Sequence, residues 1–211
     1  MSLYLVLDGV DGCGKSSQAS LLTAWAIDRG HEVVHLREPG STPLGEALRR
    51  LLLDRDGAAM SPLTEALLFT AARAEMVREL VAPALAKGKV VIAERCFLST
   101  LVYQGIAPAD ESARVPLPLL RELGRRAHGI TMPDRIVVLD LDVDVARARR
   151  AHQNPDRIEA RERGYHQRVR EGFLGLAREE AHCTVVDASG SHEDVQRRLR
   201  AVVEPLLPRP R

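Results

Sequence analysis

The 211-residue sequence is short of cysteine, of net charge and of long apolar runs. Its three cysteines, Cys13, Cys96 and Cys183, are too few and too far apart for a disulfide framework or a CxxC metal site, which indicates a reducing compartment, by default the cytoplasm. Thirty lysines and arginines oppose 29 aspartates and glutamates, so no bulk field attracts the chain to nucleic acid or to an anionic membrane. Apolar runs fall short of the roughly 20 residues that cross a bilayer. These absences predict a globular protein with neither nucleic acid nor membrane as a partner.

Apolar, β-branched segments do recur, and longer segments with helical periodicity separate them. We expect strands at residues 3–8, 32–36, 89–94, 135–142 and 184–188. The first of these ends at Asp8 and follows no basic segment, so we expect a strand there and not a signal peptide. The alternation predicts an α/β fold in a single domain over residues 1–211, with a central five-stranded parallel sheet flanked by helices.

Start and stop signals place the segments between the strands. We expect helices over residues 15–29 and 62–87, each closed by a glycine. Three prolines predict a loop over residues 105–118. Asp140 and Asp142 are predicted to end a strand and cap the next helix rather than to bind a second metal ion.

The segment DGVDGCGKSS, residues 8–17, matches the phosphate-binding pattern G-x-x-x-x-G-K-[ST] between a predicted strand and a predicted helix. Its glycines let main-chain amides point inward, Lys15 reaches the β and γ phosphates, and Ser16 offers a hydroxyl to Mg²⁺. The alternatives are an ordinary glycine-rich turn and a dinucleotide fingerprint, but Ser17 stands where that fingerprint needs a third glycine. A guanine-reading GTPase is disfavoured because N-K-x-D is absent. The predicted triphosphate site comprises Gly9, Val10, Asp11, Gly12, Cys13, Gly14, Lys15, Ser16 and Ser17.

Arginines follow the second and third predicted strands, in REPGST and ERCFLST. Because the carboxyl ends of parallel strands meet at one edge of a sheet, Arg37 and Arg95 are expected to converge near the P-loop. Two guanidinium groups there could bind an anionic acceptor such as a monophosphate. The alternative is that each arginine pairs with its neighbouring glutamate, Glu38 or Glu94, in a structural ion pair.

Two further groups of residues could bind a base or a sugar. Phe69 and Arg73 lie four residues apart on the predicted helix and so share a face, which could turn a ring and a guanidinium toward one cleft. The alternative is a core phenylalanine and a solvated arginine. In STLVYQG, Thr100 and Gln104 have the same spacing, with Tyr103 beside them, and the three side chains either bind a ligand or cover a helix.

Together these motifs resemble the thymidylate kinase family over nearly the whole chain. The resemblance is carried by DGVDGCGKSS, REPG at 37–40, LLFTAAR at 67–73, ERCFLSTLVYQG at 94–105 and DRIE at 156–159. It implies a three-layer P-loop kinase fold, ATP and Mg²⁺ as cofactors, phosphorylation of dTMP to dTDP, and a homodimer that could use the apolar face of Leu67, Leu68 and Ala71.

The resemblance also implies roles for single residues on the acceptor side. Arg37 and Arg95 would bind the dTMP phosphate, and Asp11 would accept a hydrogen bond from the 3′-hydroxyl. Phe69 would stack on thymine, Arg73 and Thr100 would hydrogen-bond the base, Tyr103 would lie where a ribose 2′-hydroxyl would clash, and Gln104 would line the same pocket. The adenine of ATP is expected near residues 187–190.

On the catalytic side, residues 147–161 resemble the LID segment that closes over the triphosphate. None of the variable P-loop residues from Val10 to Cys13 is cationic, so the LID is expected to supply the arginine that meets the transferred group. The catalytic residues expected are Lys15, Arg95 and one of Arg149, Arg150 and Arg157. Ser16 and Glu94 are the expected metal ligands, with Glu94 standing where the family usually has an aspartate.

Two other functions stay open at this point. A deoxynucleoside kinase would act on a hydroxyl and would need Glu94 or Asp8 as a base. A nucleotide-binding regulatory module without catalysis is the other, because the segment IAPADES after Gly105 departs from the family pattern. The monophosphate kinase is preferred, since a nucleoside brings no phosphate for Arg37 to bind.

Overall fold

The structure is a computed structural model that describes residues 2–57, 59–152 and 154–209. Within these residues five parallel strands form one sheet in the order β2–β3–β1–β4–β5. The strands are β1 (Leu3–Asp8), β2 (Val33–Arg37), β3 (Val90–Glu94), β4 (Arg135–Asp140) and β5 (Cys183–Asp187). The predicted α/β class and five-stranded parallel sheet are therefore confirmed. The register sets Leu7 and Arg37 level with Glu94, so the polar residues after these strands lie at one edge.

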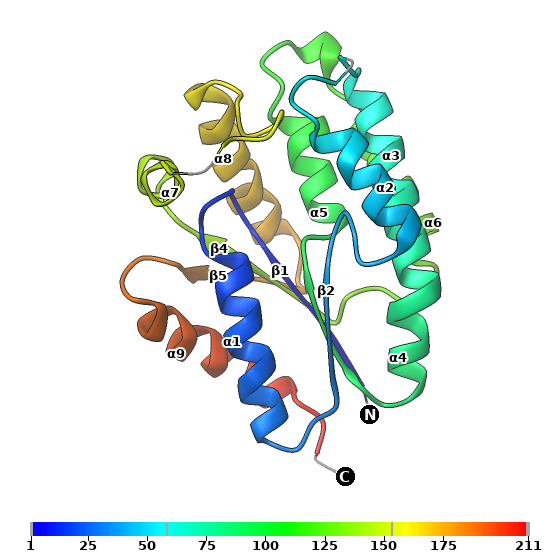
Figure 1. Cartoon of the computed structure of the whole chain (residues 1–211), viewed down its shortest axis with the longest axis vertical. Helices are drawn as coiled ribbons and strands as arrows, with labels where there is room; N and C mark the ends of the chain where they lie inside the picture. The colour runs from blue at the N-terminus through cyan, green and yellow to red at the C-terminus, as the bar shows by residue number, and fades with distance from the viewer. Residues whose placement is uncertain (1, 58, 153, 210–211) are drawn as a thin grey trace.

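Helices cover both faces of the sheet (Figure 1). On one face lie α1 (Lys15–Asp28) and α9 (His192–Val203), which also pack on each other. The opposite face carries α4 (Ala82–Ala86), α5 (Phe97–Thr100) and α8 (Arg163–Glu179). Because the central strand β1 is covered from both sides, its whole length is apolar up to Asp8 and buried.

The remaining helices pack mainly on other helices. They are α2 (Pro43–Leu53), α3 (Pro62–Met76), α6 (Leu117–His128) and α7 (Val143–Arg149). Short 3₁₀ turns lie at Glu111–Ala113 and Glu204–Leu206. None of the helices in the described part of the chain is long and apolar enough to cross a membrane.

The long helix predicted over residues 62–87 is not uniform. Its middle, Val77–Val81, is a π-helix between α3 and α4. Pro83 supplies the physical reason, because a proline has no amide hydrogen and its ring crowds the carbonyl four residues earlier in an ordinary helical turn. The start of α3 is as predicted, with the Ser61 hydroxyl accepting a hydrogen bond from the amide of Thr64.

The loop predicted over residues 105–118 is wrong at both ends. A π-helix, Leu101–Ile106, extends α5 into it, and α6 begins at Leu117 with Pro118 in its first turn, where a proline is tolerated. The fourth strand ends at Asp140 and not at residue 142, because Asp142 caps α7 by accepting hydrogen bonds from two amides of its first turn. The second and fifth strands are displaced by one residue from the predicted ranges.

Candidate active site

The loop between β1 and α1 curls at the carboxyl edge of the sheet. Gly9, Gly12 and Gly14 have φ angles of 132°, 84° and 99°. At Gly12 a Cβ would lie 2.3 Å from the main-chain oxygen of Ala146 in α7, so the loop and α7 can approach this closely only at a glycine. Val10 and Cys13 turn their side chains into the core, which leaves only their main chain for a ligand.

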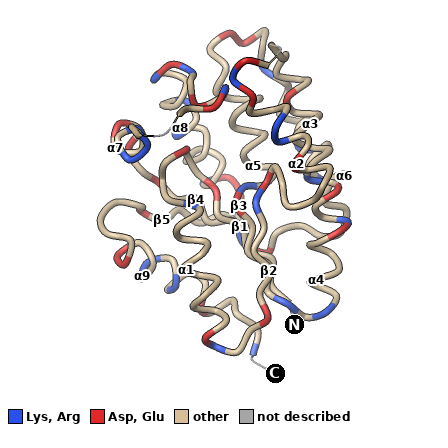
Figure 2. Tube along the Cα trace, viewed as in Figure 1, with Lys and Arg blue, Asp and Glu red and all other residues tan. Residues whose placement is uncertain are grey.

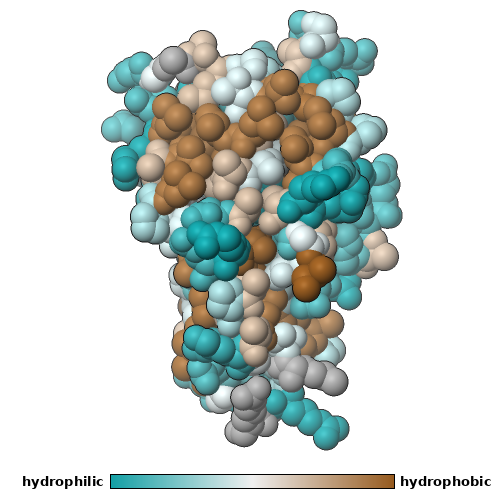
Figure 3. Space-filling view, turned by 90° about the vertical axis from the view of Figure 1, so that its right-hand side faces the viewer, coloured by the Kyte–Doolittle hydropathy of each residue, from teal (hydrophilic) through white to brown (hydrophobic). Residues whose placement is uncertain are grey.

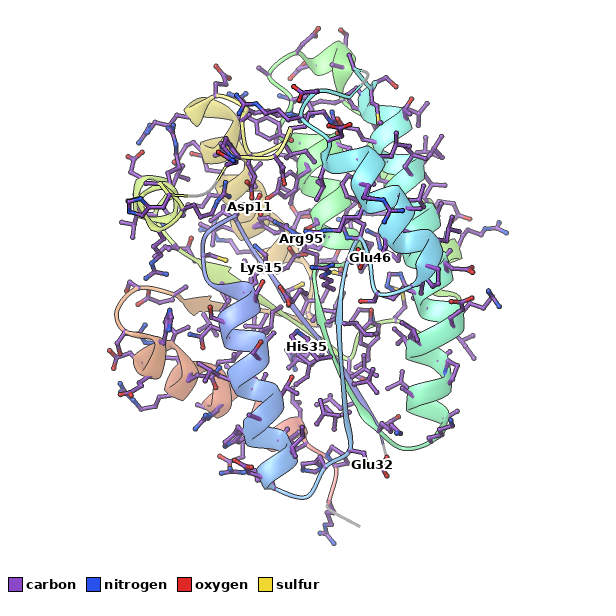
Figure 4. The ribbon with its side chains drawn as sticks, in the orientation of Figure 1. Asp11, Lys15, Glu32, His35, Glu46 and Arg95 are labelled. Carbon is purple, nitrogen blue, oxygen red and sulfur yellow. The ribbon has the colours of Figure 1, made fainter. Side chains whose placement is uncertain are left out.

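Lys15 begins α1 and lies against the inside of this loop. Its Nζ donates to the carbonyls of Gly9, at 3.0 Å, and Val10, at 2.8 Å. A buried cation, successive main-chain amides and the amino end of a helix thus lie together, which is an arrangement that attracts phosphate. Figure 4 shows Asp11 on this loop and Lys15 at the start of α1, next to Arg95, which follows β3.

Two adjoining cavities open above the loop, with volumes of about 750 Å³ and 110 Å³. The larger, which we call the outer cavity, is lined by P-loop residues, by the two strand-end arginines and by the start of α9. The P-loop residues that line it are Asp11, Gly12, Gly14, Lys15, Ser16 and Ser17. Of the loop expected near adenine, Gly190 lines this cavity.

Arg37 and Arg95 both line the outer cavity, so the predicted convergence is confirmed. Neither arginine pairs with its neighbouring glutamate, so that alternative is wrong. Arg37 is half exposed and contacts Glu46 in α2 at 3.1 Å, and Arg95 pairs with Asp11. An anion that enters between the two arginines therefore meets one half-exposed and one mostly buried guanidinium group.

Arg95 is held by its backbone as well as by its side chain. Its φ of 72° is unusual for a residue with a side chain, and it turns the chain from β3 into α5 while the amide donates to the carbonyl of Leu7 at 2.8 Å. The guanidinium contacts Asp11 and donates to Ser99 Oγ at 3.0 Å. Such a residue loses little further freedom when it binds a ligand.

Asp11 joins the P-loop to the helix that follows β3. Its carboxylate accepts hydrogen bonds from Arg95 and, at 2.9 Å, from the Tyr103 hydroxyl. Burial acts to raise the pKa of Asp11, but the charges of Arg95 and Lys15 lower it more, and the net pKa lies well below its usual value. Asp11 is thus an anion placed between the two cavities, both of which it lines.

The smaller, inner cavity brings together the residues predicted to bind a base and a sugar. It is lined by Phe69, Arg73, Thr100, Tyr103 and Gln104. Arg73 is buried, donates to Thr100 Oγ1 at 2.9 Å and forms a two-point ion pair with Glu38, so the predicted alternative of a solvated arginine is wrong. The inner cavity shares Asp11, Glu38, Arg49, Arg95 and Glu159 with the outer one.

The arginines of the LID segment lie in two places. Arg149 and Arg150 line the outer cavity, with Arg150 2.8 Å from Glu159. Arg157 instead donates to Glu65 Oε1 in α3 at 2.6 Å and to the carbonyl of Leu52 at 2.9 Å. The structure therefore brings the first two arginines to the P-loop and leaves Arg157 on the α2–α3 side. Residue 153 of this segment lies outside the described residues.

Glu94, at the end of β3, lies beside Ser16. Its Oε2 accepts a short hydrogen bond from the Ser16 hydroxyl, and its Oε1 lies 3.0 Å from Nε2 of His35. Burial acts to raise the pKa of Glu94, but the hydrogen bonds from His35 and Ser16 lower it more, so the net pKa is below its usual value. No cluster of three or more His, Cys, Asp or Glu side chains within the described ranges could hold a metal ion by itself.

Sequence reasoning missed several side chains of the site, above all Glu38, Arg49, Glu65 and His35. Glu65 could have been found from the sequence, because it precedes Phe69 by four residues and so lies on the same helical face. In the structure its carboxylate accepts hydrogen bonds from Arg157 and Gln104. Glu38 was considered only as a partner of Arg37, but it points to the other side of β2, toward Arg73. No local pattern connects Arg49 or His35 with the P-loop.

A phosphate-binding loop that faces two strand-end arginines in one cavity, and that adjoins a second cavity lined by a phenylalanine ring and hydrogen-bonding side chains, defines a nucleotide-dependent phosphotransferase of the P-loop kinase class. Comparison with known proteins narrows the class. The family model for thymidylate kinase matches residues 7–199, and the chain belongs to this family of nucleoside monophosphate kinases, which use ATP.

Individual relatives agree with this assignment over the full chain. The chain is 49% identical over 210 residues to a thymidylate kinase of Symbiobacterium thermophilum, covering 99% of this chain and 96% of the relative. It is 40% identical over 208 residues to a thymidylate kinase of Clavibacter michiganensis, with 97% and 96% covered. The crystal structure of thymidylate kinase from Ehrlichia chaffeensis superimposes with a TM-score of 0.73 at 27% identity, covering 98% of this chain and 99% of that one.

Proposed function

We propose that this protein transfers the γ-phosphoryl group of ATP to dTMP and so forms dTDP and ADP. The observation that carries the proposal is the common wall of the two cavities, where Asp11 and Arg95 lie between the P-loop and the predicted base pocket. The family assignment supports the same reaction.

In this proposal the P-loop and Lys15 hold the triphosphate of ATP, and the inner cavity holds dTMP with its base between Phe69 and Arg73. Arg37 and Arg95 hold the dTMP phosphate in the outer cavity, in line with the γ-phosphate. Asp11 accepts a hydrogen bond from the 3′-hydroxyl, and Tyr103 fills the space that a 2′-hydroxyl would need. Thr100 and Gln104 complete the wall of the base pocket.

The reaction then needs position and charge neutralisation rather than a strong base. The acceptor phosphate is already ionised, so one of its oxygens forms the new bond to the γ-phosphorus while the bond to the β–γ bridging oxygen breaks and ADP leaves. Arg149 and Arg150, which line the outer cavity, are the LID arginines placed to meet the charge on the transferred group.

We propose Mg²⁺ as the metal, with Ser16 and Glu94 as its protein ligands. The donors fit, because both present oxygen atoms, which are already in contact with each other at the edge of the outer cavity. Mg²⁺ is commonly held by one or two protein oxygens together with phosphates and water, so a larger cluster is not required. Bound there, the ion would neutralise charge on the β- and γ-phosphates.

A coupled ADP-release assay with ATP, Mg²⁺ and either dTMP or thymidine tests the proposal. We expect turnover with dTMP and none above background with thymidine. A hydroxyl acceptor would need a carboxylate base, and Asp8 is unsuited to that task because it is fully buried, lines neither cavity and accepts a hydrogen bond from Ser99 Oγ at 2.7 Å. Turnover with thymidine alone, or ATP binding without acceptor-dependent turnover, would contradict the proposal.

We also propose a homodimer, formed through the apolar side of α3. Leu63 and Leu67 in α3 are each more than two-fifths exposed, as is Leu119 in α6. Figure 3 shows hydrophobic side chains gathered over the upper part of the face that carries these helices. Light scattering of the wild type and of Leu67→Glu tests this, with a dimer and a monomer as the expected masses. In keeping with its three scattered cysteines, the cytoplasm is the proposed compartment.

A further inference from the structure

We infer that His35 is a positioning residue for the metal ligand Glu94, an inference that rests on the Mg²⁺ site of the proposed function. His35 is in β2, opposite Ile92 of β3, and Glu94 lies two residues beyond Ile92 on the same face of that strand. The imidazole and the carboxylate are therefore diagonal neighbours across two paired strands, 3.0 Å apart at their polar atoms. Figure 4 shows His35 on β2, farther from Asp11 of the P-loop than Arg95 is.

The hydrogen bond has a defined direction. An ionised carboxylate has lone pairs and no hydrogen, so Glu94 can only accept, and Nε2 of His35 carries the proton that is donated. Because His35 and Glu94 are both mostly buried, with side chains 27% and 14% exposed, water competes weakly for this bond. The pairing thus orients Oε1 from the side of the sheet, away from the cavity.

The two carboxylate oxygens of Glu94 have different partners. Oε1 receives His35, and Oε2 receives the Ser16 hydroxyl at the edge of the outer cavity. A hydroxyl oxygen can hold a cation through a lone pair while its hydrogen still points at Oε2, and Oε2 keeps lone pairs for the same ion or for a water bound to it. His35 stays bonded to Oε1 with and without the ion and keeps the carboxylate from rotating.

The length of the Glu94 side chain explains why a positioning residue is useful here. A glutamate has one more rotatable bond than an aspartate, so more side-chain entropy is lost when it is fixed at a metal site. A hydrogen bond from a neighbouring strand removes that freedom before the ion arrives, as hydrogen-bonded partners of metal ligands generally do. His35 and Glu94 therefore act together, with His35 fixing the carboxylate that binds the ion.

The test measures metal-dependent nucleotide binding without turnover. The affinity for the β,γ-imido analogue of ATP is determined by calorimetry with Mg²⁺ and with EDTA. We expect His35→Phe and His35→Leu, two variants without a donor, to reduce the gain in affinity due to Mg²⁺ about tenfold and to leave the affinity in EDTA unchanged. His35→Gln, whose amide can donate from a similar position, is expected to restore most of the gain.

Two controls separate positioning from structural damage. His31→Phe alters a histidine in the segment that precedes β2, outside both cavities, and is expected to behave as the wild type. In a Glu94→Asp background the shorter carboxylate does not reach Nε2, so His35→Phe is expected to have no further effect. In turnover assays the apparent activation constant for Mg²⁺ should rise in His35→Phe while the KM for dTMP is unchanged.

The possible failures are distinguishable. If the wild type shows the gain with Mg²⁺ and both donor-free variants keep it, the role of His35 is wrong and the proposed reaction stands. Equal losses of affinity with Mg²⁺ and with EDTA also overturn the inference, because they indicate a general disturbance of the site. If Mg²⁺ changes neither the affinity nor the turnover of the wild type, the metal site itself is wrong.

Discussion

Glu38 and Arg73 form a two-point ion pair beneath the inner cavity, and both side chains are almost fully buried. Burial acts to raise the pKa of Glu38, and the charge of Arg73 opposes that rise. The pair connects the end of β2 to α3, and Arg73 also donates a hydrogen bond to Thr100 in α5. The base pocket is thus built on a charged contact that water does not reach.

This burial predicts a large difference between two ion pairs. Glu38→Ala leaves the buried Arg73 cation without its carboxylate partner and should lower the free energy of unfolding by about 3–5 kcal/mol. Arg37→Ala removes the half-exposed pair with Glu46 and should lower it by less than about 1 kcal/mol. Urea denaturation of the two variants measures both values. Similar losses would contradict a larger contribution of the buried Glu38–Arg73 pair to stability.

The positions of the LID arginines predict unequal effects on turnover. Arg149→Ala and Arg150→Ala should each lower kcat about 100-fold or more with little change in ATP affinity, because these side chains line the outer cavity. Arg157→Ala removes contacts to Glu65 and the Leu52 carbonyl instead, so its kcat should fall less. Steady-state kinetics measures kcat of the three variants, and calorimetry measures their affinity for ATP. Arg157→Ala as the most damaging of the three would show that the LID rearranges on binding.

Two substitutions of Tyr103 separate its hydroxyl from its ring. Tyr103→Phe removes the hydrogen bond to Asp11 but keeps the ring, so kcat/KM for dTMP should fall about tenfold with discrimination against the ribonucleotide retained. Tyr103→Ala opens the space beside the sugar and should reduce that discrimination at least about tenfold. The measurement is the ratio of kcat/KM for dTMP to that for ribothymidine monophosphate. Equal ratios in the wild type and Tyr103→Ala would remove Tyr103 from sugar selection.

His128, near the end of α6, predicts how stability depends on pH. Burial, and then the charge of Arg73, lowers its pKa from 6.5 to about 4. Between these values the unfolded chain binds a proton that the folded protein does not, so stability should fall as the pH decreases from 7 toward 4. The contribution lost between pH 7 and pH 5 is about 2 kcal/mol.

The comparison is between the wild type and His128→Phe, each unfolded in urea at pH 7 and pH 5. The substitution removes little from the folded state, because Nδ1 bonds only the Gly124 carbonyl, at 2.9 Å, and Nε2 is buried without a partner among the described residues. The variant should therefore lose about 2 kcal/mol less than the wild type on acidification. An identical pH dependence would show that His128 is not buried in its neutral form.

The exposed charges of the surface contribute less to stability than the buried Glu38–Arg73 pair. Figure 2 shows acidic and basic residues interspersed along the trace in this view, in keeping with the near-zero net charge. Some of the pairs are between exposed residues three or four apart, such as Arg126 with Glu122, and such pairs add little to stability. The charges that matter for the site are those enclosed with it.

Features that depend on local patterns were predictable. The strand, the glycines and the helix start around Lys15 follow from spacing alone, because a curled loop with inward amides requires residues without a Cβ at fixed positions. The N-cap at Asp142 was predictable for a different local reason, because a short side chain with an oxygen just before a helix can accept hydrogen bonds from the amides of its first turn. Where a local rule gave a wrong result, as with the loop over residues 105–118, a proline taken to exclude a helix was in fact part of its first turn.

The sequence by itself determined the parallel sheet, the P-loop and the placing of Arg37 and Arg95 at one edge, because these follow from the alternation of strands and helices and from the direction of parallel strands. Only the tertiary structure decided the partners: Glu38 with Arg73, His35 with Glu94, and Arg157 with Glu65. Those pairs join residues 35, 59 and 92 positions apart. Such contacts depend on how whole elements pack, and no short-range pattern along the chain encodes that packing.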